Sequence, residues 1–153
     1  MGEAVFLALI ALHVLAATTW VGGVLFFVFA VVPAARAAPG AGIPEALGRA
    51  FRPVAYVALG TLIVTGPLLL WILGIGPGMF LQARFWADPF GITLGAKLVM
   101  VGLVLALTVW HDTVLGPRGL RTGQPGATRI VGRTIGLLSV AILLAGLLLA
   151  QGL

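Results

Sequence analysis

Four long apolar runs constrain the fold of this chain more than any other feature of its sequence. They cover residues 5–32, 54–73, 92–115 and 135–149. A helix needs about 20 apolar residues to cross a hydrocarbon core of roughly 30 Å. With 61% hydrophobic and 8% charged residues, the chain is also far from the average composition of soluble domains. We therefore predict an all-α, multi-pass protein of the inner (cytoplasmic) membrane, with residues 1–153 forming one four-helix bundle.

The basic residues predict the direction in which the chain crosses the bilayer. The hairpin between the second and third runs has only Arg84, which Asp88 balances. The other arginines gather in the connections on either side: Arg36, Arg49, Arg52, Arg118, Arg121, Arg129 and Arg133. By the positive-inside rule, both Arg-rich loops are cytoplasmic and both termini lie on the outer side. The net charge of +5 is thus a topology signal, so we expect the lipid bilayer and no nucleic acid as a partner.

Several classes of chemistry are excluded by what the sequence lacks. The absence of cysteine excludes disulfides, thiolate metal sites and thiol redox chemistry. There is no Gly-rich phosphate loop, nucleophile elbow, carboxylate dyad or zinc spacing. Hydrolysis and phosphoryl transfer are therefore not expected. Binding, electron or proton transfer, transport and a structural role remain; no catalytic residue is assigned, and it stays open whether the protein is an enzyme.

His13 and Trp20 mark a candidate cofactor site in the first run. They are seven residues apart and lie on nearly the same helix face, with the small residues Ala16, Ala17 and Gly23 along the same stripe. We interpret the stripe as a groove for a flat ligand such as a porphyrin or a quinone. The alternative is that His13 hydrogen-bonds a neighbouring helix while Trp20 simply packs.

Lys97 is the only lysine and lies roughly 7 Å inside the outer end of the third run, at 1.5 Å per residue. It either snorkels to the surface or points into the bundle, where it attracts a carboxylate such as a ligand propionate. We expect His13 and Lys97 at similar depths, as a joint cofactor site. His13 and His111 are separated along the helix axes by about 15 Å, so they cannot both ligate one metal ion.

His111 and Asp112 end the third run at a helix C-terminus, where the helix dipole favours a cation and opposes a carboxylate. Asp112 therefore needs a cationic partner, and the candidates are Arg118, Arg36, Arg49 and Arg52. The pair either clamps the loops or takes part in proton transfer or metal binding. The candidate metal ligands of the chain are thus His13, His111 and Asp112.

Glycines recur at helical spacing in the third and fourth runs: Gly91, Gly95, Gly102, Gly132, Gly136 and Gly146. In lipid, such seams allow close approach of helix backbones. Packing within the bundle is our main interpretation, and a homodimer contact is the alternative.

Two motif-bearing segments carry a family resemblance: "LHVLAATTWVGGVLFFVFAVVP" at 12–33, and "FWADPFGITLGAKL" through "WHDTVLGPR" at 85–118. Their His followed by Trp-x-Gly-Gly, the Asp-Pro-Phe-Gly lead-in, the lysine and the His-Asp…Gly-Pro-Arg ending resemble the copper-resistance D (CopD-like) family of small bacterial membrane proteins. The likeness covers about a third of the chain. It implies copper handling or copper-linked redox homeostasis, through His13, His111 and Asp112.

The Leu-His…Trp of the first run and the Lys…His of the third are also similar to the four-span, haem-containing protoporphyrinogen oxidase family. The matching positions are His13, Trp20, Lys97 and His111. This weaker resemblance implies a haem b protein that oxidises a porphyrin or a quinol, with His13 as candidate haem ligand. A third hypothesis, suggested by the glycine seams and the scarcity of reactive groups, is a non-catalytic accessory subunit of a respiratory complex or a partner of another membrane redox protein.

Overall fold

The computed structural model describes residues 2–37, 42–115 and 126–151. The described chain is all-α, and four of its helical segments are long and apolar enough to span a membrane: Gly2–Ala37, Ile43–Ile72, Pro89–Leu115 and Gly126–Ala150. The prediction of an all-α, multi-pass membrane protein is confirmed at this level. Each of the four helical segments begins before its apolar run, because a helix satisfies its own backbone hydrogen bonds and need not end where the hydrocarbon does.

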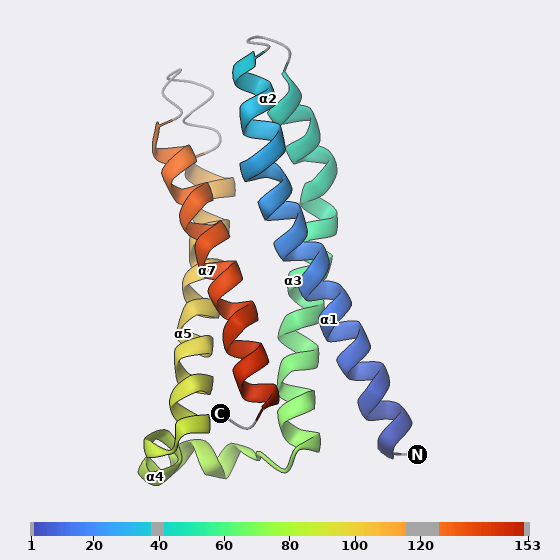
Figure 1. Cartoon of the computed structure of the whole chain (residues 1–153), viewed down its shortest axis with the longest axis vertical. Helices are drawn as coiled ribbons and strands as arrows, with labels where there is room; N and C mark the ends of the chain where they lie inside the picture. Colours follow the sequence, from blue (N-terminus) through green and yellow to red (C-terminus); the bar gives the residue numbers. More distant parts are fainter. Residues whose placement is uncertain (1, 38–41, 116–125, 152–153) are drawn as a thin grey trace. The chain divides into compact units, whose positions relative to one another are not determined.

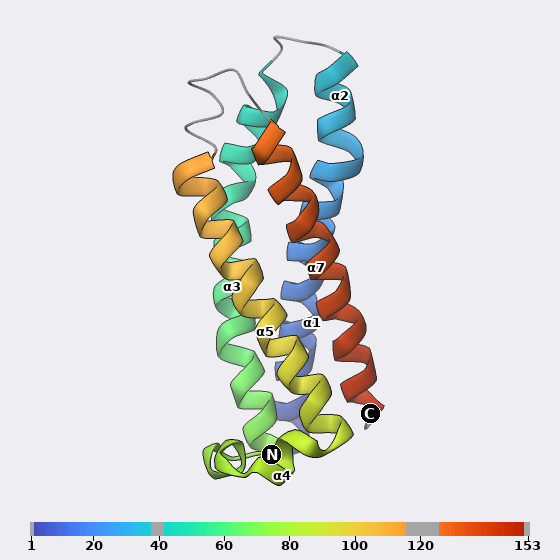
Figure 2. The same cartoon turned by 90° about the vertical axis from the view of Figure 1, so that its left-hand side faces the viewer.

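The chain divides into two compact units, Met1–Leu81 and Gln82–Leu153. Each unit contains one pair of long helices that run side by side in opposite directions, as both views show (Figures 1 and 2). Each pair is thus an antiparallel helical hairpin. The assembly of both hairpins into one bundle remains a prediction.

The first unit is built from one broken helix and one continuous helix. Helix α1 (Gly2–Phe26) passes through a π-helical turn, η1 (Phe27–Val31), into α2 (Val32–Ala37), and α3 (Ile43–Ile72) packs back along α1 (Figure 1). The 3-10 turn η2 (Pro77–Leu81) ends the unit.

Two contacts fix the register of this hairpin. His13 meets Thr65, and the ring centroids of Phe27 and Phe51 are 6.0 Å apart. In both pairs the residue numbers sum to 78, as expected for antiparallel helices with one constant register. Small residues permit the close approach, because a Cβ atom at Gly23 would overlap the ring of Phe51.

The second unit contains the short helix α4 (Ala83–Ala87), then α5 (Pro89–Trp110), which continues into the π-helical turn η3 (His111–Leu115), and α7 (Gly126–Ala150). Asp88 caps α5 by accepting a hydrogen bond from the Phe90 amide at 3.0 Å.

Helix α4 folds against the first turn of α5 at a glycine (Figure 1). A Cβ atom at Gly91 would overlap the carbonyl group of Phe85. The Phe85 ring is buried and meets those of Trp86 and Phe90 edge-on. This aromatic cluster at the end of a span suits the headgroup region, where amphipathic rings concentrate.

Candidate functional site

His13 on α1 is held by a hydroxyl group of α3. Its Nδ1 atom lies 2.7 Å from Oγ1 of Thr65, a residue that is only 2% exposed. The Thr65 hydroxyl donates its single proton to the carbonyl oxygen of Thr61, also at 2.7 Å. Nδ1 of His13 is therefore the donor in the first contact, and the lone pair of the neutral ring is on Nε2.

The His13 ring lies against α3 at a residue that has no side chain. A Cβ atom at Gly66 would be 3.7 Å from Cε1 of the imidazole, so the ring sits close to a residue without a side chain. The hydrogen bond to a neighbouring helix, which the sequence offered as an alternative to a ligand role, is thus present. It is compatible with that role, because metal-bound histidines commonly donate their second ring N–H to an oxygen atom.

The stripe predicted to form a ligand groove is largely packed. Trp20 and Ala16 are buried, at 6% and 7% exposure, and Gly23 is covered by the Phe51 ring. An open apolar groove of about 550 Å³ exists in the same unit; it is lined by Thr18, Thr19, Gly22, Gly23, Phe26, Phe27, Leu47, Ala50, Phe51 and Val54. Neither His13 nor Trp20 lines it, so a flat ligand in this groove would not meet the histidine.

Lys97 lies in the second unit, against α7. Its Nζ atom would be 3.4 Å from a Cβ atom at Gly146. His13 belongs to the first unit, and the joint site expected for His13 and Lys97 remains a prediction.

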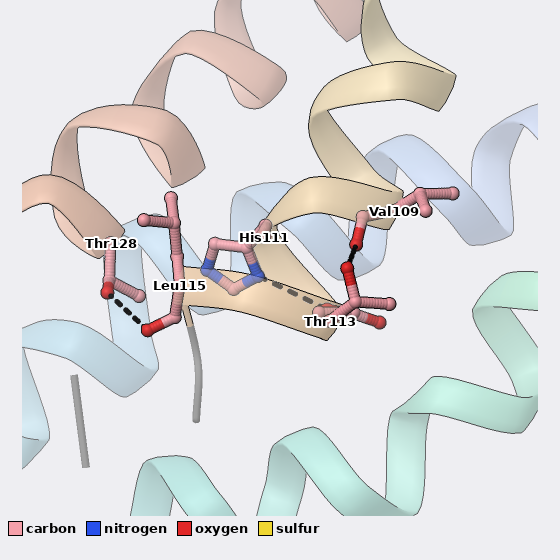
Figure 3. A network of polar contacts seen from close by, with 6 residues as sticks. Val109, His111, Thr113, Leu115 and Thr128 are labelled. Carbon is pink, nitrogen blue, oxygen red and sulfur yellow. Dashed lines mark hydrogen bonds and ion pairs between the residues drawn. The ribbon is translucent and has the colours of Figure 1, made fainter. Parts of the chain in front are cut away.

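His111 and Asp112 open the π-helical turn η3 (Figure 3). Nδ1 of His111 lies 3.2 Å from Oδ1 of Asp112, and their side chains are 30% and 22% exposed. A carboxylate accepts and cannot donate, so Nδ1 is again the donor, and in the neutral ring the lone pair is on Nε2. Arg118, one predicted partner of Asp112, lies outside the described residues.

The turn is held in place by two threonine hydroxyls. That of Thr113 donates to the carbonyl of Val109 at 2.7 Å, and that of Thr128 on α7 reaches the carbonyl of Leu115 at 3.5 Å (Figure 3). A π-helical turn presents its carbonyls and side chains at unusual angles, and such turns are frequent at functional sites.

No group of three or more His, Cys, Asp or Glu residues that could hold a metal ion occurs in the described parts of the chain. In each described histidine, Nδ1 instead lies against an oxygen atom that orients the ring. Any metal held here would complete its coordination with groups outside such a cluster.

Sequence analysis missed Thr65 and Gly66, and it named Gly146 only as part of a glycine seam. The register of the helices reveals the pairing, because α1 and α3 are antiparallel and the numbers of their facing residues sum to 78, as for His13 and Thr65. The chain matches no protein-family model, no curated protein and no solved structure.

Proposed function

We propose that the protein handles copper, or serves copper-linked redox homeostasis, at single-histidine sites in the cytoplasmic membrane. The CopD-like motifs motivate the proposal. The structural observation that supports it is shared by both described histidines: Nδ1 of His13 donates to Thr65, and Nδ1 of His111 donates to Asp112. An oxygen acceptor of this kind fixes the tautomer and raises the basicity of Nε2, which is the arrangement of a metal-binding imidazole.

Asp112 takes a different role from that of a direct metal ligand. Its Oδ1 atom faces Nδ1 of His111, so it acts as an orienting acceptor behind the ring and the ligand nitrogen is Nε2. A single imidazole per site binds copper more weakly than a closed cluster of ligands does. Such sites suit the transfer of copper to a partner better than its storage.

The two histidines lie at different ends of their hairpins. His13 is far along α1 from the turn of the first hairpin, whereas His111 is next to the turn of the second. With the arginine-bearing turns in the cytoplasm, as the positive-inside rule predicts, His13 belongs to the outer half of the membrane and His111 to its cytoplasmic edge. One histidine then serves each side.

Equilibrium dialysis of the purified protein against micromolar Cu(I) and Cu(II) tests the proposal. We expect stoichiometric binding that falls by one site in His13→Ala and by one site in His111→Ala. Asp112→Asn keeps an oxygen near the ring while it removes the charge, and should weaken the His111 site without abolishing it. Absence of copper binding at micromolar concentration would refute the proposal.

Haem b is a second candidate, and one observation favours it. Haem iron needs only one or two axial ligands from the protein, and His13 is a half-buried, oriented single imidazole. Protein expressed with ample haem should then show a Soret band that His13→Ala removes and His111→Ala retains. An absorption spectrum with elemental analysis of the same sample separates haem, copper and neither, and a missing Soret band rejects this candidate.

A further inference from the structure

Lys97 places an ammonium group within a segment long and apolar enough to span a membrane. It is half-buried and stands eight residues after Pro89, the first residue of α5, which corresponds to about 12 Å along the helix. A charged side chain at such depth is unfavourable unless it is paired or reaches water. The position of the Lys97 amine therefore determines which partners it can contact.

The amine of Lys97 does not run along its own helix toward the nearer end. Its Nζ atom lies beside Gly146 of α7, and these two residue numbers sum to 243. The contact between Leu115 and Thr128, at the opposite end of the hairpin, gives the same sum. The amine therefore crosses to α7 at its own level, four residues before α7 ends at Ala150.

No acidic side chain in the described part of the second unit lies near this charge. Among its described residues the acidic side chains are Asp88 and Asp112. Asp88 caps α5 and is about 13 Å away along the axis, while Asp112 faces His111 more than about 20 Å away. Lys97 has no hydrogen bond or ion pair with any residue that the structure describes.

Gly146 has no side chain at the position where the Lys97 ammonium needs a partner of opposite charge. Any larger residue there would place a Cβ atom 3.4 Å from Nζ, which is ordinary contact distance, and further side-chain atoms would fill the adjoining volume. With glycine, Nζ is the one atom outside the nearby backbone of α7 that lies within 4 Å of this Cβ position, which leaves room for an oxygen atom that hydrogen-bonds the ammonium.

We propose that Lys97 and the space at Gly146 bind the anionic head of an amphipathic molecule, either a carboxylate or a phosphodiester. A single ammonium matches one negative charge. The site lies about 6 Å from the end of α7, which puts the head near the membrane boundary and lets an apolar tail lie along the helices. The site requires neither copper nor haem.

Trp86 is a native fluorophore at the same end of α5 as this site. Ring atoms of Trp86 lie 3.2 and 3.4 Å from the Cβ position of Gly95, two residues before Lys97. Bromine on an acyl chain bound there would quench Trp86. The full-length protein is reconstituted in phosphatidylcholine vesicles with small fractions of brominated oleic acid, brominated phosphatidylglycerol or, as the zwitterionic control, brominated phosphatidylcholine. Trp86→Phe identifies the local part of the signal.

We expect at least one brominated anion to quench Trp86 more than brominated phosphatidylcholine at equal fraction. Lys97→Met should weaken the apparent affinity on the order of tenfold, as for loss of a charge-assisted hydrogen bond. Gly146→Leu should weaken it similarly, and Lys97→Arg, the matched control, should retain it.

The two anionic arms distinguish the source of the head group. Quenching by the oleic acid alone assigns a carboxylate, and quenching by the phosphatidylglycerol alone assigns a phosphodiester. The proposal is overturned if neither anion quenches more than brominated phosphatidylcholine does, or if Lys97→Met leaves the quenching unchanged. The quenching assay contains no metal, so its result does not depend on whether the protein binds copper.

Discussion

Replacing Thr65 by valine tests whether the hydroxyl holds the His13 ring. Valine has nearly the same shape, so the change opens no cavity and removes only the oxygen atom. Two contacts of 2.7 Å disappear: the one accepted from Nδ1 of His13 and the one donated to the carbonyl of Thr61. The helical carbonyl keeps its backbone bond, whereas the imidazole N–H loses its acceptor.

A buried donor without a partner costs about 1–3 kcal/mol. Interhelical hydrogen bonds in membranes average about 0.6 kcal/mol, because the separated helices find other partners. We therefore expect Thr65→Val to lower the free energy of unfolding by about 1 kcal/mol. Loss of such an oxygen partner typically lowers metal affinity about 10–100-fold, so copper or haem binding at His13 should fall more visibly than stability does.

Stability is measured by unfolding in mixed detergent and SDS, with tryptophan fluorescence as the signal, since Trp20 is buried in the same hairpin. Thr61→Val is the matched control. It lies one turn earlier on α3, and its hydroxyl donates to the carbonyl of Val57 in its own helix. Thr65→Ser should behave as the native chain. If Thr65→Val is as stable as Thr61→Val and binds ligand equally well, the assignment of the Nδ1 donor is wrong.

Three further predictions concern packing and topology. Gly23→Ala should destabilise the first hairpin by about 1–3 kcal/mol through overpacking, whereas Gly22→Ala, whose Cβ atom meets nothing within 4 Å, should not; equal unfolding midpoints would contradict this. Thr108→Val should raise the free energy of unfolding by about 1 kcal/mol, because its hydroxyl is buried without a partner among the described residues; a lower free energy of unfolding would contradict this. The chain has no native cysteine, so on intact cells a membrane-impermeant maleimide should label Gln82→Cys and spare Ala37→Cys; the reverse pattern would invert the topology.

The helical secondary structure and the four candidate spans followed from the length and composition of the apolar runs, because a chain in lipid must satisfy its backbone internally. The candidate residues His13 and Lys97 were also recognisable, since an ionisable side chain in a span stands out against its neighbours. Their partners were harder to find. Thr65 looks like any membrane threonine, and only the register that pairs it with His13 gives it a role.

Trp20 illustrates the opposite case. A tryptophan seven residues after a histidine indicates a shared face, but the sequence does not tell whether that face meets a ligand or another helix. In the structure Trp20 and Ala16 are buried, and the Phe51 ring of α3 covers Gly23. The ring of Phe51, which covers Gly23, comes from a part of the chain where periodicity gave no hint of the contact.

The two π-helical turns, Phe27–Val31 and His111–Leu115, have a consequence for comparing this chain with others. A π-helical turn accommodates one more residue than the α-helical turn that it interrupts. Deleting that residue keeps the helix intact and rotates everything beyond it by about 100°. A related sequence that differs by a single-residue gap at either turn could therefore share all four helices and yet turn Arg36, or the end of the third span, toward a different neighbour.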